Sequence, residues 1–218
     1  MVFVSWGFVN SCARKLLNKA AIKLNNFCDP APLLQEVNEQ LAYSRSKTYN
    51  QILLINKCVA WREMGQFDQA LQTLEHLNID QYSGTLPQTK VVYYNNLADA
   101  FIEMKDAEKA MLWLSKASQI AADLKNRKLK MILQDSLLWN YAGIANLRGQ
   151  YDEAEQLLLQ NTGKVKPLRR KVSEAILLAD IYANQGKHDS ALQQLNFVIT
   201  NGNKVFDVQK AQKMMDIL

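Results

Sequence analysis

Glycine and proline are scarce in this chain, with eight glycines and four prolines among 218 residues. The prolines fall between amphipathic runs or in a first helical turn, where a missing N–H does no harm: Pro30, Pro32, Pro87 and Pro167. No Gly/Ser-rich linker divides the sequence, and the alternation typical of β-strands is missing nearly everywhere. The composition therefore favours one continuous all-α domain.

Cysteine and histidine are equally rare. Cys12, Cys28 and Cys58 form no CxxC pair and are odd in number, which predicts free, packed thiols in a reducing compartment. His76 and His188 have no Cys, Asp or Glu at metal-ligand spacing. HExxH, GxSxG, Walker and dinucleotide-binding motifs are all missing. We therefore expect a non-enzymatic protein with no metal and no cofactor.

What the sequence does contain is a pattern that returns four times. Amphipathic runs that begin near Leu53, Tyr93, Leu137 and Ala175 are each followed by a short polar break and a second amphipathic run. Small residues recur in phase, where two helices would cross: Cys58, Ala98, Ala142 and Ala179 in the first runs, and Ala70, Ala110, Ala154 and Ala191 in the second. Since one helix pair cannot bury its apolar stripe alone, the pairs are expected to stack.

The breaks carry a further signature, with Gly65, Gly149 and Gly186 each followed two places later by a ring residue (Phe67, Tyr151, His188). The second copy has Lys105 and Ala107 instead. This pattern resembles the tetratricopeptide repeat over roughly residues 50–200, although the alanines are 40, 44 and 37 residues apart rather than about 34. The closing segment also resembles that of small repeat proteins from Gram-positive bacteria.

The resemblance implies a right-handed superhelical solenoid of antiparallel helix pairs. We expect an atypical N-terminal hairpin in residues 1–48, four repeat-like pairs in 49–202 and a C-terminal capping helix in 203–218. Within the hairpin, Asp29 is predicted to cap a second helix whose first residue is Pro30. The first helix, over 3–26, has one apolar stripe: Trp6, Val9, Ala13, Leu16, Leu17, Ala20 and Leu24.

The opening MVFVSWGFV is apolar and aromatic. It is shorter than the ~20 residues of a membrane-spanning helix and lacks the features of a cleavable signal peptide. Packing onto the solenoid and insertion into a membrane interface both remain open. We expect a cytoplasmic protein, with a peripheral position at the inner face of the membrane as the alternative.

The resemblance also implies a concave groove lined by the first helices of successive pairs. The candidate peptide-binding residues on that face are Asn56, Asn95, Asn96, Asp99, Trp139, Asn140, Asn146, Asp180 and Asn184. Asparagine amides can both donate to and accept from a peptide backbone, and Trp139 can anchor an apolar group. The alternative is that the asparagines only solvate this face and Trp139 packs within its own hairpin.

The formal net charge is +5, and the excess is clustered. Two groups lie between repeats and are expected to form one basic rim: Lys125, Arg127, Lys128 and Lys130, and Lys164, Lys166, Arg169, Arg170 and Lys171. Such a rim is either a solvated edge or a contact for an acidic partner or an anionic membrane. Aromatic residues are not interleaved with these cations, so nucleic acid is an unlikely partner.

The leading hypothesis is therefore a scaffold that binds a protein or peptide segment in the concave groove. A membrane-surface adaptor and a peptide-sensing regulator are the alternatives. The sequence carries no helix-turn-helix unit ahead of the repeats, which argues against a DNA-binding regulator. The oligomeric state is left open.

Overall fold

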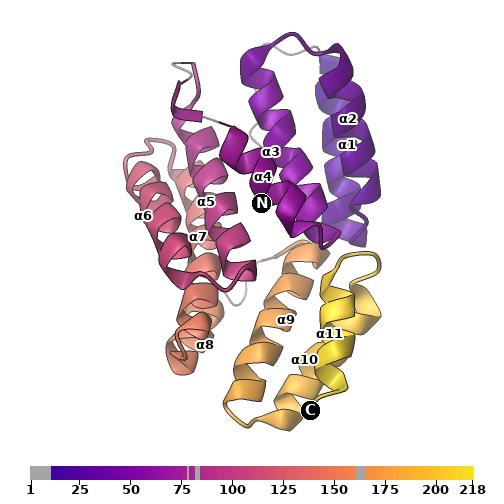
Figure 1. The fold of residues 1–218 in the computed structure, drawn as a ribbon, viewed down its shortest axis with the longest axis vertical. Coiled ribbons are helices and arrows are strands. Elements are labelled where there is room, and N and C mark those ends of the chain that lie inside the picture. The colour runs from indigo at the N-terminus through magenta and orange to yellow at the C-terminus, as the bar shows by residue number, and fades with distance from the viewer. Residues whose placement is uncertain (1–10, 78, 82–83, 161–164) are drawn as a thin grey trace.

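The computed structural model describes residues 11–77, 79–81, 84–160 and 165–218 (Figure 1). All regular structure in these ranges is helical, with eleven α-helices and one 3₁₀ turn. The helices are α1 (Ser11–Phe27), α2 (Ala31–Tyr43), α3 (Lys47–Glu63), α4 (Phe67–His76), η1 (Ile79–Gln81), α5 (Pro87–Glu103), α6 (Ala107–Ala122), α7 (Arg127–Leu147), α8 (Tyr151–Leu159), α9 (Leu168–Asn184), α10 (His188–Asn201) and α11 (Asp207–Met215).

Four consecutive helix pairs, α3/α4, α5/α6, α7/α8 and α9/α10, form the repeats. The small residues that recur in the sequence lie where the helices of the solenoid pack. All eight are at most 3% exposed: Cys58, Ala70, Ala98, Ala110, Ala142, Ala154, Ala179 and Ala191. The all-α repeat solenoid is confirmed, since each pair buries its apolar stripe against neighbouring helices.

The first helix of every pair ends in a Schellman motif. In the first pair, Gly65 has a φ of +75°, its N–H donates to the Arg62 carbonyl (2.9 Å), and the next N–H reaches the Trp61 carbonyl (2.8 Å). Gly149 repeats this geometry with a φ of +73°. The second pair makes the same turn with Lys105 at a φ of +59°. A non-glycine residue is strained in this left-handed region.

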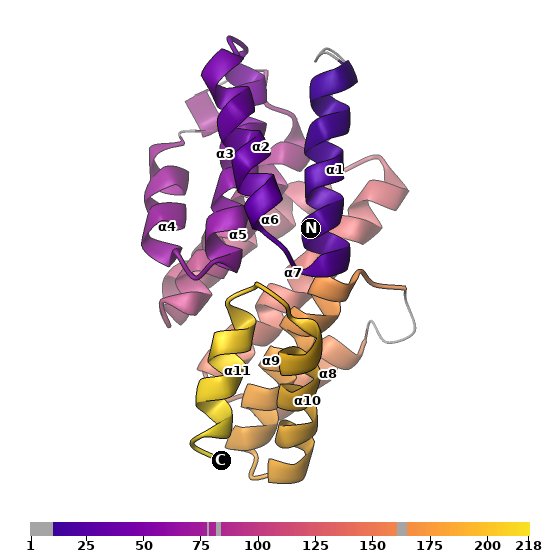
Figure 2. The same cartoon turned by 90° about the vertical axis from the view of Figure 1, so that its right-hand side faces the viewer.

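The two ends of the solenoid meet (Figures 1 and 2). Helix α2 packs on α3, as expected of a terminal hairpin, but α1 contacts α9, the first helix of the last pair. Leu24 and Leu33 from the N-terminal hairpin share one hydrophobic core with Val198 and Ala211 from the C-terminal helices. The chain therefore curves into a closed arrangement, which the sequence did not predict.

Backbone hydrogen bonds link the same two ends. The Lys204 N–H donates to the Cys28 carbonyl (3.2 Å), and the Phe206 N–H donates to the Glu63 carbonyl (2.7 Å). The Phe206 ring packs edge-on against Phe67, with ring centroids 5.3 Å apart. The residues before α11 are therefore held against both α1 and the α3–α4 turn.

The details at the ends differ from the sequence-based expectations. Helix α2 begins at Ala31, so Pro30 is its N-cap and not its first residue as predicted, while the Asp29 side chain does accept the Ala31 N–H (3.2 Å), as a capping residue does. The last helix begins at Asp207 instead of Lys204. Predicted residues 3–10 of the first helix lie outside the described part of the chain. None of the described helices is long and apolar enough to cross a bilayer.

Candidate functional site

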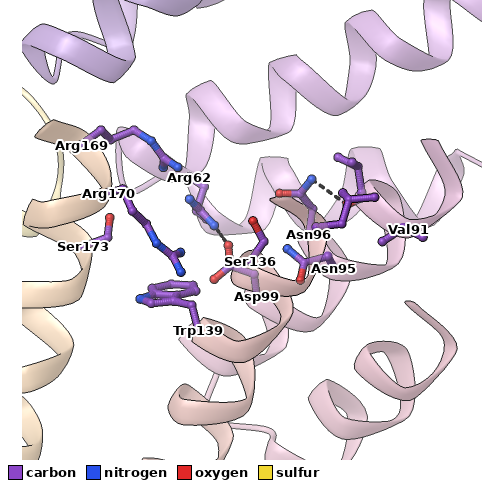
Figure 3. Close-up of a pocket in the computed structure, with 12 residues that line it drawn as sticks. Arg62, Val91, Asn95, Asn96, Asp99, Ser136, Trp139, Arg169, Arg170 and Ser173 are labelled. Atoms are coloured by element: carbon purple, nitrogen blue, oxygen red, sulfur yellow. Dashed lines mark hydrogen bonds and ion pairs between the residues drawn. The ribbon is translucent and has the colours of Figure 1, made fainter. Parts of the chain in front are cut away.

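Two adjoining pockets lie on the inner side of the closed solenoid, between the first helices of the repeats. The arginine pocket is polar, holds about 40 Å³ and is shown in Figure 3. Its lining comes from α3, α5, α7 and α9: Arg62, Val91, Val92, Asn95, Asn96, Asp99, Leu133, Ser136, Trp139, Arg169, Arg170 and Ser173.

The α11 cavity, of about 340 Å³, lies between α11 and helices α5, α7 and α9. It shares Arg62, Trp139 and Ser173 with the arginine pocket, so the two form one groove. Large apolar side chains contribute to its lining: Ile102, Leu147, Ile176, Leu177, Phe206 and Met214. A cavity of this size can accommodate a bulky side chain or a small ligand.

A buried ion-pair network connects α3, α5 and α9 beside the arginine pocket. Arg62 pairs with Glu63 at 2.6 Å and with Asp99, and Glu63 also pairs with Arg169. The side chains of Glu63, Asp99 and Arg169 are only 4%, 2% and 6% exposed. Burial alone would raise the pKa of Glu63, but the charges of Arg169 and Arg62 outweigh it and hold that pKa below its usual value. The network therefore links the first and last repeats across the closed arrangement.

Trp139 is fixed at the junction of the two pockets. The Arg170 guanidinium lies over its ring, 5.3 Å from the centroid, as Figure 3 shows. Arg170 is itself held by Glu174 (2.9 Å) and by the Asp135 carbonyl (3.0 Å). The cation–π contact and these bonds orient the indole toward the groove.

Several buried polar atoms around the groove lack a hydrogen-bond partner within the described chain. They are Asp99 Oδ1, Trp139 Nε1, Asn146 Oδ1 and Arg169 Nε. Two are acceptors and two are donors. Buried polar atoms are rarely left unpaired, so these atoms mark where water or a ligand is expected to bind.

Six of the nine predicted groove residues do line the groove. Asn95, Asn96, Asp99 and Trp139 line the arginine pocket. Asn146 and Asp180 line the α11 cavity, where the Asn146 amide donates to Asp180 at 2.6 Å.

The other three predicted groove residues line neither pocket. Asn56 is buried and donates to the Ile52 carbonyl (2.8 Å), one turn back on its own helix. Asn184 makes the same kind of bond to the Asp180 carbonyl and does not line either pocket. Asn140 is fully buried and donates to the Asn95 carbonyl (2.9 Å), which joins α7 to α5. Asn56 and Asn140 are therefore buried away from the groove, whereas Asn184 is exposed outside both pockets.

The predicted basic rim is not one surface. Arg169 and Arg170 line the arginine pocket in ion pairs, and Lys166 pairs with Glu174 at 2.8 Å. The expectation of a continuous exposed rim was wrong for these three, because Glu63 on α3 and Glu174 on α9 hold them inward. The remaining positions are separate: Lys125, Arg127, Lys128 and Lys171 are exposed, Lys130 donates to the Ala122 carbonyl (2.6 Å), and Lys164 lies outside the described residues.

Sequence reasoning missed the contribution of α11, which was expected only to cap the last repeat. Helix α11 does contact α9 and α10, but it also supplies part of the cavity lining. Lys210 pairs with Glu103 on α5 (3.5 Å), and Asp207 accepts the Ser173 hydroxyl (3.2 Å). The sequence did contain a signal for this role, because the helix also has a polar face. Asp207 and Lys210 lie on that face, three residues apart.

Asp207 makes the stability of this closure depend on pH. Burial, and then the nearby charge of Glu63, raise the pKa of Asp207 from 3.8 to about 6. A carboxyl group with a raised pKa in the folded state stabilises the fold below pH ~4, and this contribution is lost as the pH rises through about 6.

We expect Asp207→Asn to raise the free energy of unfolding by about 1–2 kcal/mol at pH 7.5 and to change it little at pH 4. The figure is below the full linkage value because Asp207 is partly exposed and screened by solvent. Urea unfolding of both proteins at the two pH values measures the effect. An equal change at both pH values would contradict the assignment to Asp207.

Family models described as tetratricopeptide repeat match residues 51–76, 91–124 and 136–160. These stretches fall on α3/α4, α5/α6 and α7/α8, three of the four pairs with in-phase small residues. The chain contains tetratricopeptide repeats. No curated protein and no solved structure matches it.

Tetratricopeptide repeats form protein-interaction scaffolds, in which stacked helix pairs create an extended binding surface. In the described ranges, no three His, Cys, Asp or Glu side chains are grouped so that they could hold a metal ion.

Proposed function

We propose that this tetratricopeptide repeat protein is a non-enzymatic scaffold that binds an extended protein segment in the groove formed by the arginine pocket and the α11 cavity. The main support is the set of unpartnered atoms around this groove, with Trp139 Nε1 as a donor and Asp99 Oδ1 and Asn146 Oδ1 as acceptors. An extended backbone presents N–H and C=O groups in alternation, so it can satisfy donors and acceptors together.

The shape of the groove supports the same proposal. The arginine pocket is small and polar, whereas the adjoining α11 cavity is larger and has apolar walls. A peptide that passes Trp139 can place backbone groups in the arginine pocket and a side chain in the α11 cavity. Buried aromatic anchors of this kind contribute much of the affinity at protein interfaces.

The state of the charged groups argues against a catalytic use of the site. Ion pairs neutralise these groups: Glu63 pairs with Arg62 and Arg169, and Asp99 pairs with Arg62. A general acid or base needs a proton-transfer group that faces substrate. These residues instead hold neighbouring helices together.

Trp139→Phe tests the proposal, because phenylalanine keeps an aromatic ring under Arg170 but removes the indole donor. We expect the affinity for a groove-bound peptide to fall about 2- to 12-fold, which corresponds to one hydrogen bond. Peptides selected on the wild-type protein from a random display library would serve as ligands, with fluorescence anisotropy as the measurement.

Trp113→Phe is the matched control. Trp113 stacks on Tyr94 with ring centroids 5.6 Å apart and does not line either pocket. Its replacement is expected to leave peptide affinity unchanged. Equal affinity of the wild type and the Trp139 variant for every selected peptide would contradict binding in this groove.

A further inference from the structure

Helix α1 has apolar side chains on two of its sides. One side belongs to the core that joins the two ends of the chain, and each of its side chains is at most 7% exposed: Leu17, Ala20, Ala21 and Leu24. Leu16, Ile22 and Phe27 lie outside that core and are 46%, 52% and 56% exposed. The sequence pattern placed Leu16 in the buried stripe, so its exposure is a finding of the structure. Packing of α1 against the solenoid does not account for these three side chains.

Three lysines share the exposed side of α1 with these apolar residues. Lys15, Lys19 and Lys23 follow one another at intervals of four residues, so they lie along one side of the helix, and all three are exposed. The Lys23 amine lies over the Phe27 ring, 5.3 Å from its centroid. The 17 residues of α1 include no Asp or Glu. We call this surface the outer face of α1: Lys15, Leu16, Lys19, Ile22, Lys23 and Phe27.

The carboxylates of α2, which packs on α1, do not cancel this charge. Glu36 is turned toward α3 together with Arg14: burial raises the pKa of Tyr49 on α3, the charge of Glu36 raises that pKa further, and the charge of Arg14 lowers it. Glu36 and Arg14 therefore offset each other on the inner side of the hairpin. Glu39 is exposed and accepts from the amide of Gln35 on its own helix (2.9 Å). On the outer side, three lysines of α1 thus stand against one glutamate of α2.

The carboxylates of α9 and of the turn after α1 are accounted for elsewhere. Glu174 pairs with Arg170 (2.9 Å), and Asp180 lines the α11 cavity. Asp29, which follows α1, pairs with Lys204 at 2.8 Å. The outer face of α1 therefore carries an excess of positive charge beside exposed apolar side chains.

An anionic membrane surface matches both properties of this face. Lysines attract the headgroups of anionic lipids, and their long stems allow apolar neighbours to reach the boundary of the acyl chains. Nucleic acid or an acidic protein would match the lysines but not the exposed Leu16 and Ile22. A second copy of the helix would bring like charges together. In the sequence, the nine residues MVFVSWGFV near the start of the chain are uncharged and include one Trp and two Phe, residue types that favour membrane interfaces.

We propose that the outer face of α1 binds membrane surfaces that contain anionic lipids. Its lysines contact the headgroups, and its apolar side chains enter the boundary between headgroups and acyl chains. A helix of 17 residues is about 26 Å long and can lie flat on such a surface. Helix α1 lies on the outside of the molecule (Figure 2) and lines neither pocket, so the groove stays accessible. This inference goes beyond the proposed function and does not depend on it.

Flotation of the full chain with lipid vesicles tests the proposal. At low salt, we expect the wild type to bind vesicles of phosphatidylcholine with about 30% phosphatidylserine, and to bind much less to phosphatidylcholine alone. Lys15→Gln/Lys19→Gln/Lys23→Gln should lower the partition coefficient about 20- to 100-fold, since each lysine near an anionic surface contributes about fivefold. Leu16→Ala/Ile22→Ala should lower it about 5- to 20-fold. High salt should weaken binding of the wild type.

The start of α7 offers matched controls. Lys125→Gln/Arg127→Gln/Lys128→Gln removes the same amount of exposed positive charge from another surface. Met131→Ala/Ile132→Ala shortens apolar side chains that are 52% and 45% exposed. Both controls are expected to bind vesicles like the wild type. Because all four variants replace exposed side chains, their melting temperatures should stay within about 3 °C of the wild type, which circular dichroism measures.

Three results would overturn the proposal. The first is a wild type that does not bind the phosphatidylserine vesicles at low salt. The second is an equal loss of binding in the α7 charge control, which would assign the effect to total charge. The third is binding that needs the lysines but not Leu16 and Ile22, with equally tight binding to duplex DNA or polyglutamate, which would identify an acidic macromolecule as the partner. Peptides selected on the groove should bind the α1 variants unchanged, so this test is separate from that of Trp139→Phe.

Discussion

Glu63→Ala is expected to lower the free energy of unfolding by about 3–5 kcal/mol. The carboxylate of Glu63 is the ion-pair partner of Arg169, and both side chains are almost completely buried. Removing it leaves a guanidinium inside the protein without a compensating charge, and the Arg169 Nε already lacks a hydrogen-bond partner. Because α9 begins next to Arg169, the loss weakens contact between the first and last repeats. Chemical denaturation at neutral pH measures this change.

Two controls identify the buried charge as the cause. The double variant Glu63→Met/Arg169→Met removes both charges and is expected to regain much of the lost stability, since a buried pair can be replaced by apolar residues. Lys90→Ala removes the partner of Asp80, which is 60% exposed, and should cost less than about 1 kcal/mol. If Glu63→Ala were no more harmful than Lys90→Ala, the network would not hold the two ends together.

Gly65→Ala is expected to cost about 2–5 kcal/mol, more than the same change at Gly186. Both glycines have nearly the same positive φ, +75° and +73°, so the backbone strain of an alanine is common to both. An added Cβ at Gly65 would lie 2.4 Å from the Phe206 ring, whereas one at Gly186 would meet nothing within 4 Å. The ring would have to leave its edge-on contact with Phe67.

Comparing Gly65→Ala with Gly186→Ala isolates the contribution of the Phe206 contact, which links the two ends of the chain. Gly186→Ala should cost about 1–2 kcal/mol, which is the strain alone. In a Phe206→Ala background, where the clash is gone, Gly65→Ala should cost no more than Gly186→Ala does. Thermal melts of the wild type and the four variants give all three costs. Equal costs for the two glycines in the wild-type background would show that Phe206 is not held over the first turn.

The repeats could be predicted because their signals are local. Ala70 and Ala154 lie at close helix crossings, and Gly65 and Gly149 adopt the left-handed conformation that ends a helix. Each signal depends on neighbours a few residues away, which the sequence displays directly. The fold class followed from four such signals in phase.

The site was predicted only in part, because its residues depend on distant partners. Arg169 looked like a surface cation, but its carboxylate partner Glu63 is 106 residues earlier in the chain. Asn56 and Asn96 share the same helical position, yet Asn96 lines a pocket and Asn56 is buried. Helical periodicity does not show how the ends of the solenoid curve toward each other. The contribution of α11 to the groove was missed for the same reason, because it depends on how the ends of the solenoid curve.

The meeting of the two ends has a mechanical consequence. An open solenoid can stretch and recoil like a spring, since each repeat touches only its neighbours and small rotations add up along the axis. Here α1 contacts α9, and the Phe206 amide is bonded to the end of α3, so a change in pitch would break contacts between residues far apart in sequence. The spacing of the inner helices is thereby fixed before any segment arrives. A binding surface with little freedom to lose on association gains affinity from that rigidity.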